Sequence, residues 1–359
     1  MNKIDDLIRL NKIQLGIRLR LKLKVYIDIN IWIRLRECFV GSPKNREYQY
    51  LYELLIDLVN HGKVVCPISQ RIFTELLKQD DYNSRINTAK VIDKLSQCFT
   101  ILSEPEREQA ELFYFVRVKI LGQNNIIPVD DFIWSNVAYV FGTFIIEDEN
   151  IPKKILDKLQ KDIFNKLLGI TLEEIIEKMG NKLPKQLLNR DISTFAINLG
   201  KMLANDKINS KKQLFLDELR GGLSVYKVTI EGFFSYIKNY DMQLYTELCT
   251  KGIKNTNDLL EIIFKDIKND SIGEYLPSFY IQLCLHTMMR WDKEREFKSN
   301  DFDDFSHASS ALPYYDYFFT EKPLSLMLNS SQFNLTKKYN KVVLNNISDI
   351  IQALKKIAI

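Results

Sequence analysis

The sequence predicts an α/β fold with a central, mostly parallel sheet that is interrupted by a large all-helical insertion. Strand and helix signals alternate at the start of the chain, which is typical of an α/β fold. The same character returns after residue 300. The long stretch between the two ends carries helix signals and no convincing pair of strands.

The N-terminal part is predicted to run strand, helix, strand, helix. Ile17–Lys24 alternates apolar and basic residues, which indicates a strand with one solvated face. It continues into Val25–Asn30, a mostly apolar run of the kind that lies covered on both faces of a parallel sheet. Tyr48–Asn60 has the apolar spacing of a helix. A second strand is predicted at Lys63–Ile68, and Ser69–Leu77 is a helix capped by its serine.

Residues 83–297 are predicted to be helical throughout. Ser103–Gly122 has a proline in its first turn and a glycine at its end, both ordinary helix boundaries. Thr171–Gly180 begins with a capping box. Asn209–Tyr240 is a long helical stretch in which Gly221–Gly222 is predicted to be a break.

The C-terminal part returns to mixed structure. We predict a helix over Asp301–Ala311, an aromatic strand over Tyr315–Thr320, a strand over Lys341–Leu344 and a closing helix over Ser348–Ala358.

Neither end of the chain has enough strands to form a stable sheet alone. We therefore expect residues 20–82 and 298–359 to form one discontinuous α/β domain, into which residues 83–297 are inserted.

Composition excludes several classes of protein. The 359 residues carry a net charge of +4, which is compatible with a nucleic-acid partner and does not require one. The five cysteines form no CxxC pair and histidines number only three, so neither a zinc site nor a disulfide framework is expected, and a cytoplasmic location is favoured. No apolar run is long enough for a membrane helix, and Met1–Leu10 lacks the apolar core of a signal peptide.

Two acidic residues stand at informative positions in the N-terminal part. Asp28 ends an apolar strand, and ligands of parallel sheets bind beyond the carboxyl ends of strands. A carboxylate there is costly unless it is solvated or bound to a cation. The alternative, equally weighted, is an aspartate that caps the following helix. Glu75 lies at the edge of the apolar face of its helix, and by itself it is most simply a surface residue.

The segment Asp301–Lys322 is the strongest signal. Acidic residues at its start suit a helix N-terminus, because they interact favourably with the helix dipole. Asp304 and His307 are three residues apart, so they share a helix face. Asp316 and Glu321 bracket the aromatic strand, and Glu321 would meet the strand-end carboxylate of the N-terminal part if the two strands were parallel neighbours.

These segments together resemble PIN-like nucleases. Asp304 followed by His307, Leu312-Pro313-Tyr314, Asp316, an apolar strand and Thr320-Glu321 is similar to the third and fourth motifs of one subgroup. Val25–Asn30 is similar to the first motif, a strand that ends in Asp-x-Asn, and Ser69–Leu76 resembles the second, a helix with one inward glutamate. The resemblance covers the two ends of the chain, roughly 120 residues, and the middle resembles no family we can name.

The resemblance implies a three-layer α/β/α fold and a metal-dependent nuclease. Asp28, Glu75, Asp304 and Glu321 would be the catalytic carboxylates and, with Asp316, the ligands of one or two Mg²⁺ or Mn²⁺ ions, hard cations that prefer oxygen. The subgroup commonly has aspartate where Glu321 stands, so the second metal site is in question. Asp316 is either a further ligand or an organiser of the strand start.

Asn30, His307 and Thr320 are expected to contact nucleic acid or to support the metal ligands. His307 is expected to be a hydrogen-bonding residue of its helix rather than a catalytic base.

RNA is favoured over DNA as substrate because the sequence shows no helical-hairpin DNA-binding signature. The resemblance suggests an endoribonuclease that acts as a toxin or an anti-phage defence effector. A protein regulator or defence-system partner and a homo-oligomer remain open. Two alternatives are a DNA nuclease and a catalytically weak or inactive module that binds nucleic acid or protein.

Overall fold

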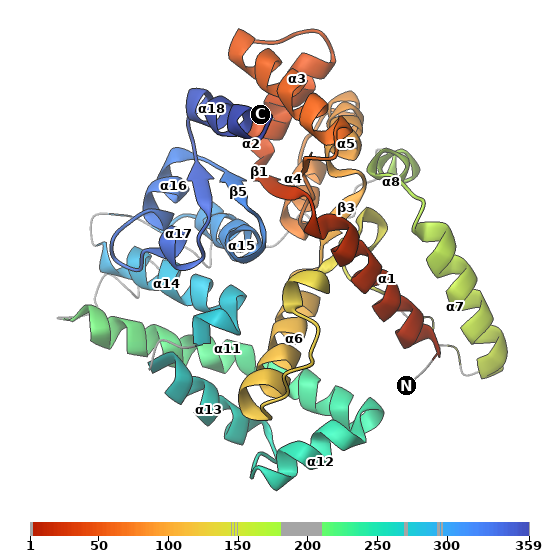
Figure 1. Cartoon of the computed structure of the whole chain (residues 1–359), viewed down its shortest axis with the longest axis vertical. Coiled ribbons are helices and arrows are strands. Elements are labelled where there is room, and N and C mark those ends of the chain that lie inside the picture. Colours follow the sequence, from red (N-terminus) through yellow and green to blue (C-terminus); the bar gives the residue numbers. More distant parts are fainter. Residues whose placement is uncertain are drawn as a thin grey trace.

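The computed structural model of the chain describes residues 3–144, 146, 148, 150–180, 210–268, 272–292, 295 and 297–358. It has a mixed α/β fold (Figure 1), as the sequence predicted. Within these residues a sheet of four parallel strands has the order β2-β1-β5-β6. The strands are β1 (Leu23–Ile27), β2 (Val64–Val65), β5 (Tyr317–Phe319) and β6 (Val342–Leu344). The two ends of the chain therefore build one sheet.

The described α-helices vary widely in length. They are α1 (Lys3–Arg20), α2 (Ile29–Phe39), α3 (Arg46–Asn60), α4 (Gln70–Leu77), α5 (Tyr82–Ser96), α6 (Glu104–Tyr114), α7 (Lys153–Leu167), α8 (Leu172–Met179), α11 (Lys211–Tyr240), α12 (Met242–Thr250), α13 (Thr256–Lys268), α14 (Pro277–Trp291), α15 (Ser299–Tyr314), α16 (Lys322–Leu328), α17 (Leu335–Lys338) and α18 (Ile347–Ala358). Within the described part of the chain, no helix is both long and apolar enough to cross a membrane.

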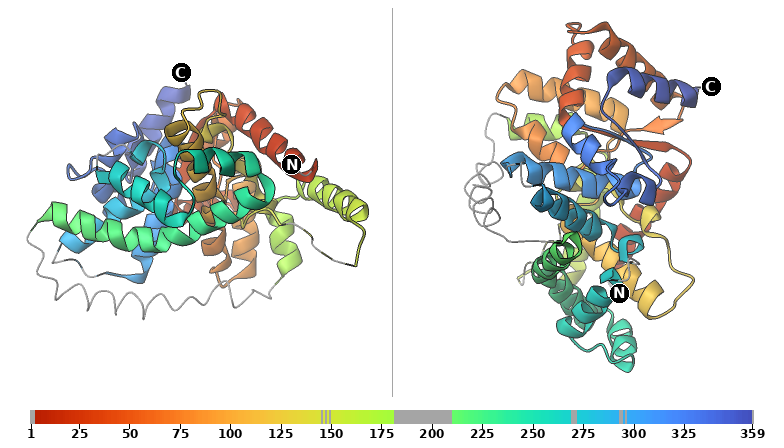
Figure 2. Two further views of the ribbon diagram at one scale, coloured as in Figure 1. Left: turned by 90° about the horizontal axis from the view of Figure 1, so that it is seen from below. Right: turned by 90° about the vertical axis from the view of Figure 1, so that its left-hand side faces the viewer.

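Helices cover the sheet on two sides. Helices α2 and α18 both pack on α3, and Figure 1 shows α3 and α18 on the opposite side of the strands from α15. Helix α4 contacts both α2 and α15. Beyond α15 the helices continue as a stack, because α14 packs on α15 and α11 packs on α14 (Figure 2). The apolar core runs without interruption from the sheet into this stack.

Register fixes which residues meet at the carboxyl edge of the sheet. Val25 pairs with Tyr317, and Ile27 pairs with Phe319. The next amide in the chain, that of Asp28, donates to the carbonyl oxygen of Phe319 at 3.0 Å. The residues that follow β1 and β5 therefore leave the sheet side by side.

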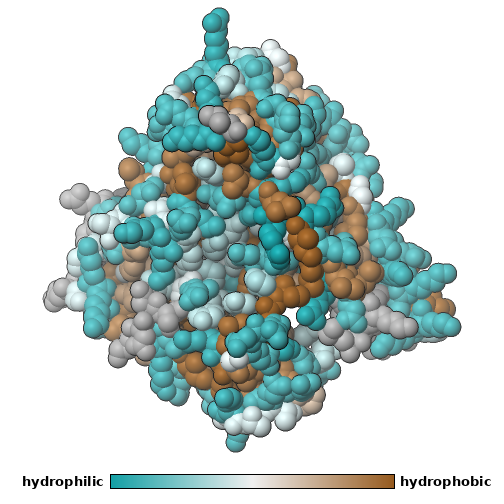
Figure 3. Space-filling view, in the orientation of Figure 1, coloured by the Kyte–Doolittle hydropathy of each residue, from teal (hydrophilic) through white to brown (hydrophobic). Residues whose placement is uncertain are grey.

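The strand expected at Ile17–Lys24 is wrong over most of its length, because residues up to Arg20 belong to α1. Leu15 and Leu19 are both buried, and their four-residue spacing is that of a helix face. Exposed apolar side chains accompany them on this helix at Leu10 and Ile17, and Figure 3 shows apolar atoms among hydrophilic ones in this region. The alternation of apolar and basic residues over Ile17–Lys24 was therefore a weaker signal than the helical spacing of Leu15 and Leu19.

The expectation of an all-helical middle is also wrong at one place. β3 (Phe99–Ile101) and β4 (Trp134–Asn136) form an antiparallel pair. Thr100 bridges to Ile68, just beyond β2, in parallel. Strand β3 therefore adjoins the chain just after β2, although it lies beyond the predicted boundary at residue 82. Part of the predicted insertion, residues 181–209, lies outside the described residues.

Helix boundaries in the middle segment were mostly predicted correctly. The capping box of Thr171 and Glu174 is present, and α6 begins with a proline in its first turn. The break predicted at Gly221–Gly222 is wrong, since α11 continues through it. A Cβ atom on Gly222 would lie 3.2 Å from the ring of Phe279. The glycine therefore permits close packing of α11 on α14.

Two glycine-to-alanine substitutions, one in α11 and one in α1, test how closely these helices pack on their neighbours. Alanine is intrinsically better than glycine in a helix, so Gly221→Ala, with open space around it, should raise the free energy of unfolding by about 0.5–1 kcal/mol. A Cβ on Gly16 would lie 2.1 Å from the carbonyl oxygen of Asp131. Gly16→Ala should instead lower the free energy of unfolding by about 1–3 kcal/mol, because α1 would have to move away from Asp131. Chemical denaturation measures both, and equal stabilisation by the two changes would contradict the placement of α1.

Candidate active site

Asp28 lies where β1 ends, and it is buried with 4% of its surface exposed. It caps α2, and its Oδ1 accepts a hydrogen bond from the amide of Asn30 at 3.0 Å. Its Oδ2 accepts from the hydroxyl of Thr320 at 3.2 Å. The capping role is thus observed, and the cap is joined to the segment that follows β5. These bonds fix the orientation of the carboxylate.

Glu321 follows Thr320 and borders the same edge. Its carboxylate accepts a hydrogen bond from the side-chain amide of Asn30. Asp28, Asn30, Thr320 and Glu321 are among the residues that line a cavity of about 650 Å³. The strand-end residues of β1 and β5 therefore face one open space.

Asp304 lies in α15 and belongs electrostatically to the same group. Burial raises the pKa of its carboxyl to about 7; His307 opposes this rise, and the negative charges of Asp28, Asp301 and Glu321 add to it. Among the described residues its side chain forms no hydrogen bond and no salt bridge, and the charge of His307 acts on it only from a distance. An ionised Asp304 therefore stands among other carboxylates without a compensating salt bridge.

The neighbouring acids of α15 differ from Asp304 in this respect. Asp303 forms ion pairs with Arg71 at 2.7 Å and Lys78 at 3.2 Å. Asp301 pairs with Arg295 at 2.7 Å. Of these three aspartates of α15, Asp304 is thus the one without a salt bridge.

Glu75 joins the site through a buried chain of hydrogen bonds. Its carboxylate lies 3.1 Å from Nε2 of His307. The other ring nitrogen, Nδ1, lies 2.6 Å from the hydroxyl of Tyr26, which lies 2.7 Å from that of Ser69. The chain connects β1, the start of α4 and α15.

The protonation of His307 follows from its surroundings. Burial alone lowers its pKa, but Tyr26, Glu75 and Asp28 outweigh that effect and raise the pKa well above the ordinary value. Both ring nitrogens of the imidazolium then donate, one to Glu75 and one to Tyr26. Tyr26 in turn donates to Ser69. Sequence reasoning recognised Ser69 as a helix cap and missed Tyr26, whose signal was a hydroxyl between two aliphatic residues of a buried strand.

Asp316 lies at the other end of β5. Its carboxylate accepts a hydrogen bond from the amide of Lys24 at 2.7 Å and forms an ion pair with the Lys24 ammonium at 3.4 Å. A strand that begins at Asp316 and ends before Glu321 separates the two acids by its whole length. Of the two roles predicted for Asp316, the structure places it to organise the strand start and not among the metal ligands.

The donor set of the edge suits a hard divalent cation. Asp28, Asp304 and Glu321 offer carboxylate oxygens, which Mg²⁺ and Mn²⁺ prefer. Among the described residues, no three Asp, Glu, His or Cys side chains converge closely enough to hold an ion in the conformations shown. Binding would therefore require rotation of one or more carboxylates, and the unpartnered Asp304 is the one with the fewest bonds to break.

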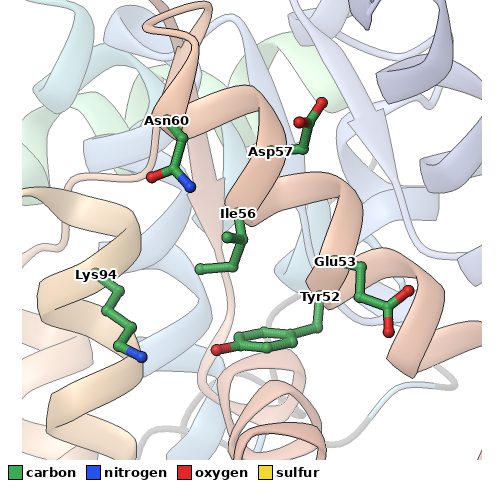
Figure 4. Close-up of a pocket in the computed structure, with 6 residues that line it drawn as sticks. All are labelled: Tyr52, Glu53, Ile56, Asp57, Asn60 and Lys94. Carbon is green, nitrogen blue, oxygen red and sulfur yellow. The ribbon is translucent and has the colours of Figure 1, made fainter.

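A second pocket, of about 510 Å³, lies between α3 and α5 (Figure 4). Its lining is Tyr52, Glu53, Ile56, Asp57, Asn60 and Lys94. It contains none of the predicted site residues, so it is separate from the candidate active site.

Comparison with known proteins identifies no relative of this chain. No protein-family model, no curated protein and no solved structure matches it. The function of the site is therefore inferred from the placement of its own residues.

The raised pKa of Asp304 predicts a pH-dependent stability in the absence of divalent ions. The unfolded carboxyl titrates near pH 3.9, so between about pH 4 and pH 7 the unfolded chain loses this proton first and stability falls as pH rises. Asp304→Asn removes the effect. In EDTA the variant should melt at a higher temperature than wild type at about pH 8, and the difference should vanish near pH 4. A difference that is the same at both pH values would contradict the burial of this charge.

The hydrogen-bond chain through Tyr26 predicts that removing its hydroxyl lowers the stability of the protein. Tyr26→Phe leaves Ser69 and Nδ1 of His307 without their shared partner, so the free energy of unfolding should fall by about 1–3 kcal/mol. Tyr50→Phe, on the exposed face of α3, is the matched control and should change it by less than about 0.5 kcal/mol. Denaturant titration of both variants measures this. Equal effects would show that the chain does not connect the elements.

Proposed function

We propose that the protein is a Mg²⁺- or Mn²⁺-dependent nuclease with a PIN-like three-layer fold, and that it hydrolyses phosphodiester bonds of RNA in the cytoplasm. One observation carries the proposal. Asp28 and Glu321, from distant segments, meet at the carboxyl edge of a parallel sheet, and their negative charges help to raise the pKa of Asp304, which forms no salt bridge in the described part of the chain. Such a group of negative charges is favourable when a cation binds to it.

The protein's own residues prepare the site. Thr320 and the amide of Asn30 hold the carboxylate of Asp28 in one orientation. The imidazolium of His307 holds Glu75 and offsets part of the negative charge around Asp304. When bound, a divalent cation supplies an activated water and stabilises the charge on the phosphate and leaving oxygen.

The preference for RNA rests on the lack of a helical-hairpin DNA-binding signature in the sequence. The role of a toxin or anti-phage effector, with a regulator that binds the helical segment, rests on the resemblance of the two ends of the chain to PIN-like nucleases. A DNA nuclease of the same chemistry is the alternative that substrate comparison decides.

A second candidate is a module that binds nucleic acid without cleaving it. Two contacts favour it: Glu75 is engaged with His307, and Glu321 is engaged with Asn30. Metal dependence separates the candidates, because a binding module needs no divalent ion to act.

The test is single-turnover cleavage of single-stranded RNA and DNA in Mn²⁺, Mg²⁺ or EDTA. Wild type should cleave RNA only with a divalent ion. Asp28→Asn and Asp304→Asn should each lose at least ~10²-fold in rate, because asparagine keeps the shape and removes the charge that binds the cation. Glu321→Gln should be milder if this residue serves a second, weaker metal position.

Asp316→Asn is the matched control, since this aspartate lies at the other end of β5. It should keep the wild-type rate. Cleavage by wild type in EDTA, or a wild-type rate for Asp304→Asn, would overturn the proposed site. RNA binding without any cleavage would favour the binding module.

A further inference from the structure

The cavity beside Asp28 and Glu321 also has basic lining residues. Arg34 and Lys44, here called its cationic wall, line it together with Tyr48 and Asn345. The volume of about 650 Å³ is within the usual range of small-ligand sites. None of these four residues was recognised in the sequence.

A single carboxylate positions the two cations. Glu37 lies 3.1 Å from the guanidinium of Arg34 and 3.3 Å from the ammonium of Lys44. Burial raises the pKa of Glu37, but its bonds to these two residues outweigh burial and lower it. Two cations share one anion, so this wall keeps a net positive charge. Arg34 and Lys44 also stay partly open to solvent, with 40% and 71% of their side chains exposed.

The lining of the cavity thus combines carboxylates, the cationic wall, and apolar and aromatic groups. Ile347 and Ile350 contribute apolar surface, and Tyr48 contributes a ring. A phosphodiester chain presents charge at regular intervals, with flat bases beside it. Bases of single strands can stack on aromatic side chains, whereas those of a duplex are already stacked on one another.

We propose that this cavity binds one unstacked nucleotide of single-stranded RNA, next to the phosphate to be cleaved. Arg34 and Lys44 contact the flanking phosphate, and Tyr48 and the neighbouring isoleucines contact the base. This inference rests on the proposed function for the position of the cleaved phosphate, and it makes the substrate single-stranded rather than duplex.

Binding in EDTA tests the inference separately from hydrolysis. A short, fluorescently labelled single-stranded RNA is titrated with wild-type protein over a range of salt concentrations, and anisotropy gives the dissociation constant. Each phosphate contact contributes about 0.7 to the slope of log affinity against log salt for single strands. The double variant Arg34→Gln/Lys44→Gln should bind at least about tenfold more weakly and lose about 0.7–1.4 of that slope.

The matched control is Arg220→Gln combined with Lys265→Gln. Arg220 pairs with Asp217 three residues away, as Arg34 pairs with Glu37, and Lys265 is an exposed lysine with one carboxylate partner. Affinity and slope should both stay at wild-type values in this control. Tyr48→Ala should weaken binding and Tyr48→Phe should not, because phenylalanine keeps the stacking surface.

The outcomes are distinct. Unchanged affinity and slope in the Arg34/Lys44 variant, or equal loss in the control, would overturn the inference, as would duplex RNA binding as tightly as single strands. If the protein cleaves RNA with Mn²⁺ but the Arg34/Lys44 variant binds RNA as wild type does, the proposed function stands and the cavity is not the RNA-binding site. The predicted loss of binding in a protein that never cleaves would support the cavity and overturn the nuclease.

Discussion

The meeting of Asp28 and Glu321 at one edge depends on the parallel pairing of β1 with β5. Asp28 and Thr320 are 292 positions apart in the chain, and their hydrogen bond exists because Ile27 stands opposite Phe319. A parallel pair requires a long crossover connection, and here the helices of the middle segment provide it. A shift of one residue in this register would turn the strand-end side chains to the other face of the sheet. The site is therefore a property of the sheet, and neither end of the chain contains it alone.

The buried chain from Ser69 through Tyr26 and His307 to Glu75 extends this control to the helices. It connects the strand with α4 and α15, and α15 carries Asp304. A paired and hydrogen-bonded charge is tolerated in the interior where a lone one is not. His307 therefore serves two purposes: it holds α15 at the sheet, and it lowers the electrostatic cost of the carboxylates around it.

The sequence predicted the outer architecture well because buried strands and amphipathic helices leave strong patterns. Val25–Asn30 and Tyr315–Thr320 were placed as strands, and their pairing was anticipated from the need for a complete sheet. The failures have physical causes. Three-residue strands such as β3 are too short to leave a clear sequence pattern. The structural role of Gly16 or Gly222 depends on which residues pack against it in the fold. The position of α1 is decided by packing against Asp131, which no local pattern contains.

Sequence reasoning proposed Asp28, Glu75, Asp304 and Glu321 as one group. In the structure Asp28 and Glu321 follow neighbouring strands and both bond to Asn30, and Glu75 is linked through His307 to Tyr26 of β1. Among the described residues no side-chain hydrogen bond or ion pair joins Asp304 to them, and the common role of the four stays a prediction. Sequence reasoning could not show that Glu75 is bound by His307, or that Asp316 lies at the opposite end of β5 from Glu321. Both facts depend on how the helices and strands are oriented relative to one another in the fold. The sequence also could not predict the cationic wall of the cavity. An exposed arginine in a helix carries no sign of function until the residues around it in the fold are known.

The central claim is that the acidic edge binds a divalent cation, and direct Mn²⁺ binding tests it without reference to any substrate. Electron paramagnetic resonance of free Mn²⁺, titrated with protein at about pH 8, where Asp304 is largely ionised, measures binding. We expect wild type to bind one or two ions and Asp28→Asn/Asp304→Asn to lose at least one of them, with both proteins folded by circular dichroism. No binding by wild type, or the same stoichiometry and affinity in the double variant, would contradict the claim.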